Sequence, residues 1–177
     1  MERIRITAGK FRGRVILAPG GTTHPMGARE KLALFNMISG ELPGARVLDA
    51  FAGSGALGIE ALSRGAKKVV FVEKTARVAR TIIENLRSLG LDGEVMMQDV
   101  SDFQTDERFE VIIADPPYDK FLVADLAGLG KMLAGDGVLV LSHPGDAPNL
   151  PNLSLVKSRK YAGARISIYR GLEPEKQ

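Results

Sequence analysis

The first candidate site is a glycine-rich segment at residues 47–58, with the sequence VLDAFAGSGALG. The segment predicts a short apolar strand, a tight turn and the start of a helix. Gly53 and Gly55 have no Cβ, so the backbone there can bend sharply and approach a ligand closely. The helix expected from Ala56 offers unpaired N–H groups to a polar ligand. The segment therefore predicts a site for a nucleotide-like cofactor.

Asp49 helps to distinguish between possible cofactors. Gly53, Gly55 and Gly58 match the pattern G-x-G-x-x-G, and Glu73 follows 20 residues after Gly53, as in dinucleotide-binding folds. The same glycines could also serve only to pack a helix on a sheet. Asp49, at the end of the expected strand, would repel a pyrophosphate. Its carboxylate suits a cofactor that is cationic there, such as S-adenosylmethionine (SAM), with its amino and sulfonium groups.

A second candidate site is Asp115-Pro-Pro-Tyr118, directly after an apolar segment at 109–114. The Asp115 carboxylate and the Pro116 carbonyl provide two acceptors on a loop that the prolines stiffen. Two acceptors can orient the poorly nucleophilic exocyclic amine of a nucleobase and stabilise its developing charge, while Tyr118 stacks on the base. A rigid turn before a helix is the alternative for an isolated D-P-P.

Strands and helices alternate through most of the chain. We expect strands at 45–50, 68–73, 94–98, 109–114 and 137–142, and helices at 56–64, 75–89 and 120–134. Apolar strands separated by helices indicate a parallel sheet that is covered on both faces. The last two strands, Leu153–Lys160 and Arg165–Arg170, have no helix between them and should pair antiparallel. We therefore predict an α/β fold of the class I SAM-methyltransferase type (Rossmann-like), with a mostly parallel seven-stranded sheet and a C-terminal antiparallel hairpin.

In that fold the carboxyl ends of the first and fourth parallel strands open into one crevice, so the two candidate sites should face each other. The first 44 residues form an extension to this arrangement. Strands are expected at Ile4–Ala8 and Arg14–Leu17, and a helix from about Ala28. We assign residues 1–44 to an RNA-contacting extension and 45–177 to the methyltransferase domain.

Composition limits the possible functions. The chain has 177 residues, 45% of them hydrophobic, which suffices for one globular core. It has no Cys, which argues against disulfides and zinc–thiolate sites, and His24 and His143 are isolated, so no metal is expected. We find no leader sequence and no membrane-spanning segment, and therefore expect a cytoplasmic monomer.

Basic residues are concentrated at the two ends of the chain. Residues 157–170 contain five basic side chains and no acidic one, and residues 1–31 contain seven basic and two acidic. Either cluster alone could be an ordinary solvated face, but two clusters on either side of a more acidic middle indicate a surface that binds a polyanion. The candidates for RNA contacts at the N-terminal end are Lys10, Arg12, Arg14, Arg29 and Lys31.

The sequence resembles the RsmD family, bacterial methyltransferases of the guanine N2 amine in 16S rRNA. The similar motifs are AGKFRGR at 8–14, LFN at 34–36, VLDAFAGSGALGIEALSRGA at 47–66, VVFVE at 69–73, DPPY at 115–118 and the hairpin at Tyr161. The resemblance implies that SAM is the cofactor and that rRNA, within the small ribosomal subunit, is the partner. DPPY alone is shared with DNA adenine methylases.

The resemblance also implies roles for individual residues. Asp49 and the backbone of Phe51, Gly53 and Gly55 would hold the methionine part of SAM, Glu73 the ribose hydroxyls, and Asp99 with Val100 the adenine. Asp115, Pro116 and Tyr118 would hold the target guanine. Glu73 and Asp99 could instead only cap the elements that follow them.

The chain departs from the family pattern at two places. His24 replaces an arginine and Ala28 an aspartate, and Tyr161-Ala-Gly-Ala164 replaces the usual Y-G-x-T. These changes affect the expected RNA contacts rather than the cofactor site. Three other functions are therefore considered: an adenine-N6 DNA methyltransferase, a nicotinamide-dependent oxidoreductase, and an inactive SAM-binding RNA module.

Overall fold

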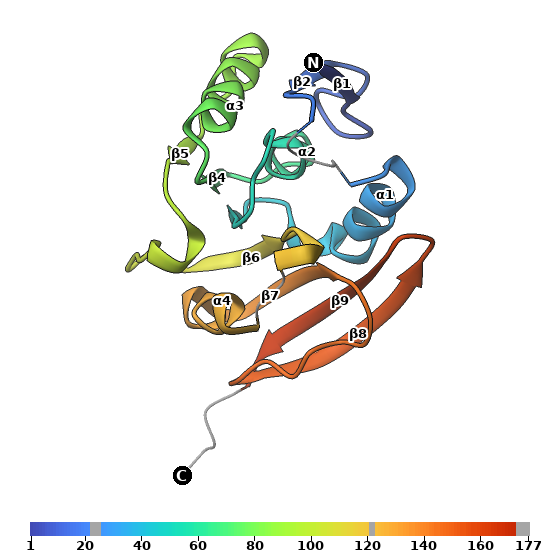
Figure 1. Ribbon diagram of the computed structural model, residues 1–177, viewed down its shortest axis with the longest axis vertical. Coiled ribbons are helices and arrows are strands. Elements are labelled where there is room, and N and C mark those ends of the chain that lie inside the picture. The colour runs from blue at the N-terminus through green and yellow to red at the C-terminus, as the bar shows by residue number, and fades with distance from the viewer. Residues whose placement is uncertain (22–25, 121–122, 173–177) are drawn as a thin grey trace.

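The computed structural model describes residues 1–21, 26–120 and 123–172. Its centre is a seven-stranded sheet in the order β5-β4-β3-β6-β7-β9-β8 (Figure 1). The five strands from β5 to β7 are parallel, and β9 runs antiparallel to β7 and β8. The strands are β3 (Arg46–Asp49), β4 (Lys68–Val72), β5 (Glu94–Met96), β6 (Phe109–Ala114), β7 (Leu133–His143), β8 (Leu153–Tyr161) and β9 (Ala164–Gly171). The predicted fold class is confirmed.

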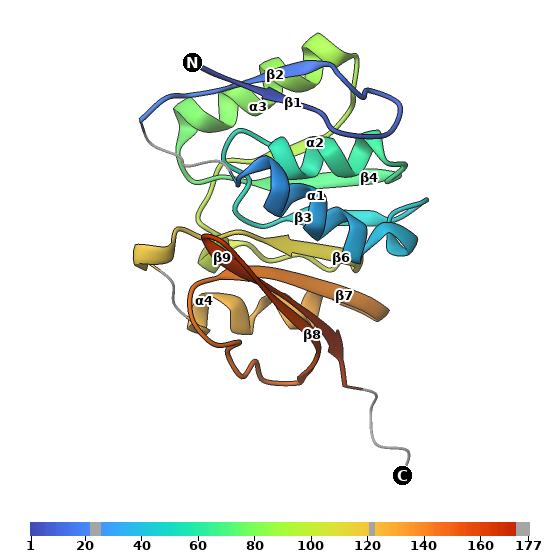
Figure 2. The same cartoon turned by 90° about the vertical axis from the view of Figure 1, so that its right-hand side faces the viewer.

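Helices cover both faces of this sheet (Figure 2). One face packs against α1 (Ala28–Met37), α2 (Ala56–Ser63) and α3 (Ala76–Leu89), with buried residues such as Phe35, Ile59 and Ile82 in a common core. The other face packs against α4 (Val123–Ala127) and neighbouring 3-10 turns, around Phe109 and Leu126. The central strands β3, β4, β6 and β7 are apolar on both sides because each contributes to both cores.

The segment predicted as one helix at 120–134 is instead a series of short elements. A 3-10 turn, η3 (Tyr118–Lys120), precedes α4, and a second, η4 (Leu129–Met132), follows it. Gly128 and Gly130 lie where a continuous helix would pass, and glycine is costly inside a helix. A side chain at Gly130 would also approach Leu153 to 3.2 Å. β7 consequently begins earlier than expected, at Leu133.

The N-terminal extension forms a separate two-stranded sheet of β1 (Glu2–Arg5) and β2 (Val15–Ala18). β1 ends at Arg5, three residues before the predicted end at Ala8, and the N–H groups of Thr7 and Ala8 instead donate to the Glu60 carboxylate on α2. Ile6, Ile16 and Phe35 of the extension nevertheless lie in the same core as the sheet. Within the described residues no helix is long and apolar enough to span a membrane.

Candidate active site

The glycine turn between β3 and α2 has the conformation that its sequence demands. Gly53 and Gly55 have φ angles of 54° and 82°, in the left-handed region that other residues rarely adopt. Gly55 is the N-cap of α2. A Cβ at Gly58 would come within 2.2 Å of the Phe71 ring, so this third glycine lets α2 pack closely on β4. The three glycines thus allow a sharp turn at the end of β3 and close packing of the helix that follows it.

Asp49 lies at the end of β3 and is 1% exposed. Its Oδ2 accepts a hydrogen bond of 2.9 Å from the N–H of Gly58, whereas Oδ1 is buried and, among the described residues, has no partner. Burial raises the pKa of Asp49 to about 7, the hydrogen bond from Gly58 opposes this, and the charges of Asp115 and Glu73 add to it. A buried carboxylate oxygen without a partner is costly. It fits the cationic part of SAM.

Glu73, the residue directly after β4, links that strand to the glycine turn. Its Oε2 accepts from the N–H of Gly53 at 3.0 Å, and its Oε1 accepts from the N–H of Thr75 at 2.8 Å. Glu73 therefore does cap the residues that follow it, as its alternative role predicted. It also braces the turn on which a cofactor would lie. Phe51, between Asp49 and this turn, is half-buried against the core on the α4 side.

Asp99 and Val100 lie after β5, at the same edge of the sheet. The Asp99 carboxylate accepts from the N–H and hydroxyl of Ser101, both at 3.1 Å, and lies 3.7 Å from the Lys74 ammonium. The N–H of Ser101 is the main cause that holds the pKa of Asp99 below its usual value. Val100 is 8% exposed. The pair places an apolar side chain beside a carboxylate at the carboxyl end of β5.

The Asp115–Tyr118 loop follows β6, which lies next to β3. Asp49 pairs in register with Ile113, so Asp115 is only two residues further along the adjacent strand. Burial raises the pKa of Asp115 to about 6, and a hydrogen bond with Ser142 opposes that shift. The Ser142 hydroxyl also bonds the Tyr118 hydroxyl at 2.5 Å. Pro116 is buried, while Tyr118 is 37% exposed and can present its ring to a ligand.

The structure thus brings the two predicted motifs to the carboxyl ends of adjacent parallel strands, where the charges of Glu73 and Asp115 act on Asp49. Three carboxylates there favour a cationic ligand and oppose a pyrophosphate. This argues against the nicotinamide-dependent alternative.

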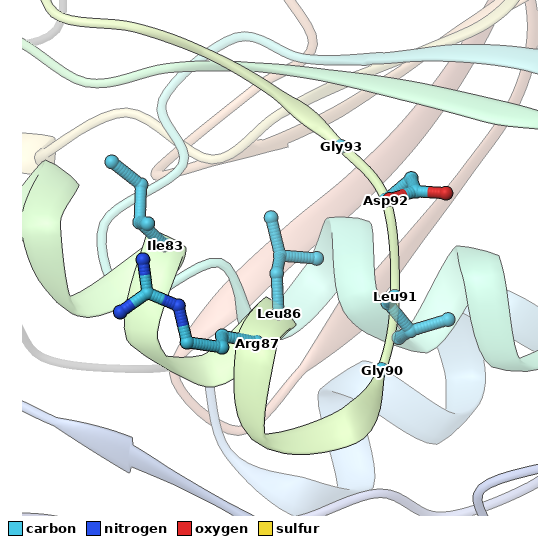
Figure 3. A pocket seen from close by; sticks show the side chains of 7 residues that line it. All are labelled: Ile83, Leu86, Arg87, Gly90, Leu91, Asp92 and Gly93. Carbon is cyan, nitrogen blue, oxygen red and sulfur yellow. The ribbon is translucent and has the colours of Figure 1, made fainter.

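A shallow groove of about 430 Å³ lies elsewhere. Figure 3 shows that it is formed by α3 and the loop before β5, with Ile83, Leu86, Arg87 and residues 90–93 as its lining. That loop is at the amino ends of the parallel strands, opposite to the edge that carries the carboxylates. The groove is not part of the candidate active site.

The structure places the predicted RNA-contacting residues in different surroundings. Arg29 is exposed on the first turn of α1. The prediction for Lys31 is wrong: it is 4% exposed, and its ammonium lies 3.4 Å from the Glu60 carboxylate and donates to the Arg5 carbonyl at 2.9 Å. It holds α1 and β1 against α2. His24 lies outside the described residues.

Lys10, Arg12 and Arg14 are exposed, but they lie far from the carboxylates. The N–H of Lys10 donates to the Ser63 carbonyl at the last residue of α2, whereas the glycine turn is at its first residue. An eight-residue helix is about 12 Å long. Figure 2 shows the loop between β1 and β2 on the right and η3 on the left. These residues would therefore contact RNA away from the reacting nucleotide.

Two residues that the motifs did not indicate support the site, and a third, Glu60, holds the N-terminal extension on α2. Ser142, at the end of β7, bonds Tyr118 and Asp115. Asn85, on α3, donates to the Ser54 carbonyl in the glycine turn at 3.1 Å and bonds both backbone groups of Leu17. Glu60 is completely buried. A polar residue at the end of the apolar run 137–142 was a usable signal for Ser142, but nothing local marks Asn85 or Glu60.

The sheet order, with antiparallel β9 between β7 and β8, is that of the class I SAM-dependent methyltransferases, and the protein is of that class. The match extends over the whole chain. The structure of an Escherichia coli protein named putative methyltransferase yhhF superimposes with a TM-score of 0.88 at 30% identity, covering 96% of this chain and 98% of that one. The predicted cofactor, SAM, agrees with this class.

Sequence comparison identifies the family. The model of the family described as conserved hypothetical protein 95 matches residues 4–170. A Bacillus subtilis protein named putative rRNA methyltransferase YlbH is 35% identical over 94% of this chain and 98% of its own length. Ribosomal RNA small subunit methyltransferase D of Haemophilus influenzae is 42% identical over 65% of this chain and 64% of its own. The chain belongs to this family, the RsmD family that its motifs indicated.

Proposed function

We propose that this protein transfers a methyl group from SAM to the N2 amine of a guanine in small-subunit rRNA. The observation that carries the proposal is the arrangement of Asp49 and Asp115 at adjacent strand ends, the first with a buried acceptor for a cationic cofactor and the second beside an exposed tyrosine. The names of the relatives support rRNA of the small subunit as the substrate class.

The cofactor half of the site is assigned to Asp49, Phe51, Gly53, Gly55, Glu73, Asp99 and Val100. Bound SAM supplies a methyl group on a sulfonium. Asp49 would offer its free Oδ1 to the cationic methionine end, and the glycine turn, which lacks Cβ atoms at Gly53 and Gly55, would allow close backbone approach. Glu73, already braced by Gly53, would accept from the ribose hydroxyls. Val100 provides an apolar contact for adenine.

The target half is assigned to Asp115, Pro116 and Tyr118. The guanine amine would donate its two N–H groups to the Asp115 carboxylate and the Pro116 carbonyl, which aims its lone pair at the methyl carbon. The amine nitrogen would receive the methyl group that bound SAM supplies, with the neutral thioether as the leaving group, and the resulting cationic nitrogen would release its proton to solvent. Alignment supplies most of the rate, and the carboxylate stabilises the developing charge. Ser142 holds both Asp115 and Tyr118 in place.

We further propose that the enzyme acts as a monomer in the cytoplasm on assembling or assembled small subunits. Arg29 would contact RNA near the target, and Lys10, Arg12 and Arg14 would contact RNA further away. The exposed positions and positive charge of these residues support this assignment.

The test is methyl transfer from labelled SAM to three substrates: unmethylated small ribosomal subunits, the naked small-subunit rRNA, and duplex DNA. Nucleoside analysis by mass spectrometry should detect N2-methylguanosine in the RNA. N6-methyladenine in DNA would establish the alternative substrate. SAM binding without transfer to any of the three would indicate an inactive SAM-binding module.

A further inference from the structure

A second groove, of about 320 Å³, lies between α1 and the edge strand β8. We call it the α1–β8 groove, and its lining residues are Ala33, Asn36, Met37, Lys157, Arg159 and Tyr161. In Figure 1, α1 lies beside the turn of the β8–β9 hairpin. The hydroxyl of Tyr161 is 4.0 Å from the sulfur of Met37, which joins the two walls at one end.

The strand places two of its three basic side chains on the face that carries α1. Lys157 and Arg159 pair in register with Ile168 and Ile166, two residues of the core on the α1 side. Alternate residues of a strand share a face, so Lys157 and Arg159 point the same way, with their Cα atoms about 7 Å apart. Lys160 pairs with Arg165 and belongs to the opposite face.

One end of the groove lies near the carboxyl ends of the parallel strands, where the candidate active site lies. Arg165, next to the β8–β9 turn, pairs with His143, the last residue of β7, just beyond Ser142. At the other wall, Glu30 in the first turn of α1 is close enough to Tyr118 to contribute to its raised pKa, although burial is the main cause. Both walls of the groove therefore extend to the side of the sheet on which the candidate active site lies.

The groove carries a line of unneutralised positive charge. Lys157 and Arg159 are exposed, and neither forms an ion pair within the described residues. Arg29 precedes Ala33 by four residues and so lies on the same stripe of α1, one turn nearer to the active site. Glu30 is the acidic residue of that turn. Polar Asn36 on the same stripe adds a hydrogen-bonding group.

We propose that the α1–β8 groove binds the sugar–phosphate backbone of the RNA next to the target nucleotide, with Lys157 and Arg159 contacting phosphates. This inference rests on the proposal that rRNA is the substrate, and it names the surface of the protein that the rRNA would contact. Basic side chains on an edge strand also oppose pairing with other sheets. That role would affect self-association and not the affinity for RNA, so the two can be separated.

The test compares two variants with equal loss of charge. The groove variant is Lys157→Gln/Arg159→Gln. The matched control is Lys131→Gln/Arg108→Gln, which also removes one exposed lysine and one exposed arginine. Lys131 precedes β7 and Arg108 precedes β6, so both lie at the amino ends of the parallel strands, away from the candidate active site. The probe is fluorescently labelled small-subunit rRNA, titrated at several salt concentrations. SAM affinity, thermal stability and size-exclusion profile are measured for each variant.

We expect the groove variant to bind the RNA at least fivefold more weakly, with the slope of log K against log salt reduced by about 1.5, because two phosphate contacts are lost. SAM affinity should not change, and the control should bind RNA as the parent does. An unchanged salt slope, an equal loss in the control, or a change confined to self-association would overturn the proposal. Because the readout is binding, absence of methyl transfer by the parent would refute the proposed function and leave this test intact.

Discussion

Asp49 and Asp115 lie at the carboxyl ends of the adjacent parallel strands β3 and β6, and the charge of Asp115 contributes to holding the pKa of Asp49 well above its usual value. The larger cause is burial. One of these two carboxylates has a buried oxygen without a partner in the described structure. Ionising both is therefore unfavourable until a cation binds beside them. The free energy that this buried carboxylate costs the free protein is a measure of the free energy that a cationic cofactor can regain by binding there.

The first prediction concerns the pH dependence of cofactor binding. Asp49, with a pKa of about 7, must be ionised to bind a cation, so SAM affinity should rise with pH between 5.5 and 7 and binding should release a proton. Calorimetry in buffers of different ionisation enthalpy would measure that proton. Asp49→Asn should weaken binding at least tenfold and abolish the pH dependence. A proton release that persists in Asp49→Asn would show that another group titrates.

The same residue should reduce the stability of the free protein. The folded-state pKa of Asp49 is raised, so its ionisation costs stability as the pH rises from about 4 towards 7. We expect Asp49→Asn to have a higher melting temperature than the parent at pH 8 without SAM, and no such gain at pH 4. Equal melting temperatures of the parent and Asp49→Asn at pH 8 would mean that other groups in the free protein already stabilise the buried Asp49 carboxylate.

Asp115 should act mainly on the chemical step. Its interaction with the amine strengthens as positive charge develops, so Asp115→Ala should lower the single-turnover rate about a hundredfold with little change in RNA affinity. Asp115→Asn keeps an acceptor oxygen and should retain more activity. In the parent the rate should fall below about pH 6, where the carboxylate becomes protonated, and this fall should be absent in Asp115→Asn. Near-normal rates in Asp115→Ala would remove the loop from the active site.

Glu73 should affect the cofactor in two ways. Glu73→Ala removes both the proposed ribose acceptor and the hydrogen bond that braces Gly53, and should weaken SAM binding tenfold or more. Glu73→Gln keeps one acceptor oxygen for one of these contacts and should lie between the parent and Ala. Calorimetric titration with SAM would rank the three proteins. Unchanged affinity in Glu73→Ala would limit this residue to its role as a cap.

Glu60 should control the attachment of the N-terminal extension. Burial alone would raise the pKa of Glu60, but hydrogen bonds from Thr7 and the charges of Lys31 and Arg64 lower it instead. Its contribution to stability is therefore present above the unfolded-state pKa and is lost as the pH falls through the folded-state value. Glu60→Gln leaves a buried lysine without its counter-charge and should cost ~3 kcal/mol at pH 7.

Denaturant unfolding at pH 7 and pH 3 would check this prediction. The difference between Glu60→Gln and the parent should be large at pH 7 and smaller at pH 3. Hydrogen exchange should show earlier opening of β1 and β2 in the variant. A stability difference that is independent of pH would indicate lost packing instead of lost charge.

The sequence by itself determined the glycine turn, the Asp115–Tyr118 loop and the fold class. Gly53 and Gly55 are required locally because their φ angles are positive, and Gly58 because a side chain would strike Phe71. Strand–helix alternation then places the ends of β3 and β6 at one edge in any doubly wound sheet. These conclusions follow from short-range chemistry and a general rule of topology.

Only the tertiary structure decided how the flanking segments are used. Lys31 looks like a surface cation until Glu60, 29 residues later, is brought beside it. Likewise, the exposed character of Lys10 and Arg12 does not reveal that they lie at the far end of α2. Their partners and distances depend on how the extension packs against the sheet, and a pattern in local sequence carries no information about contacts between segments so far apart along the chain.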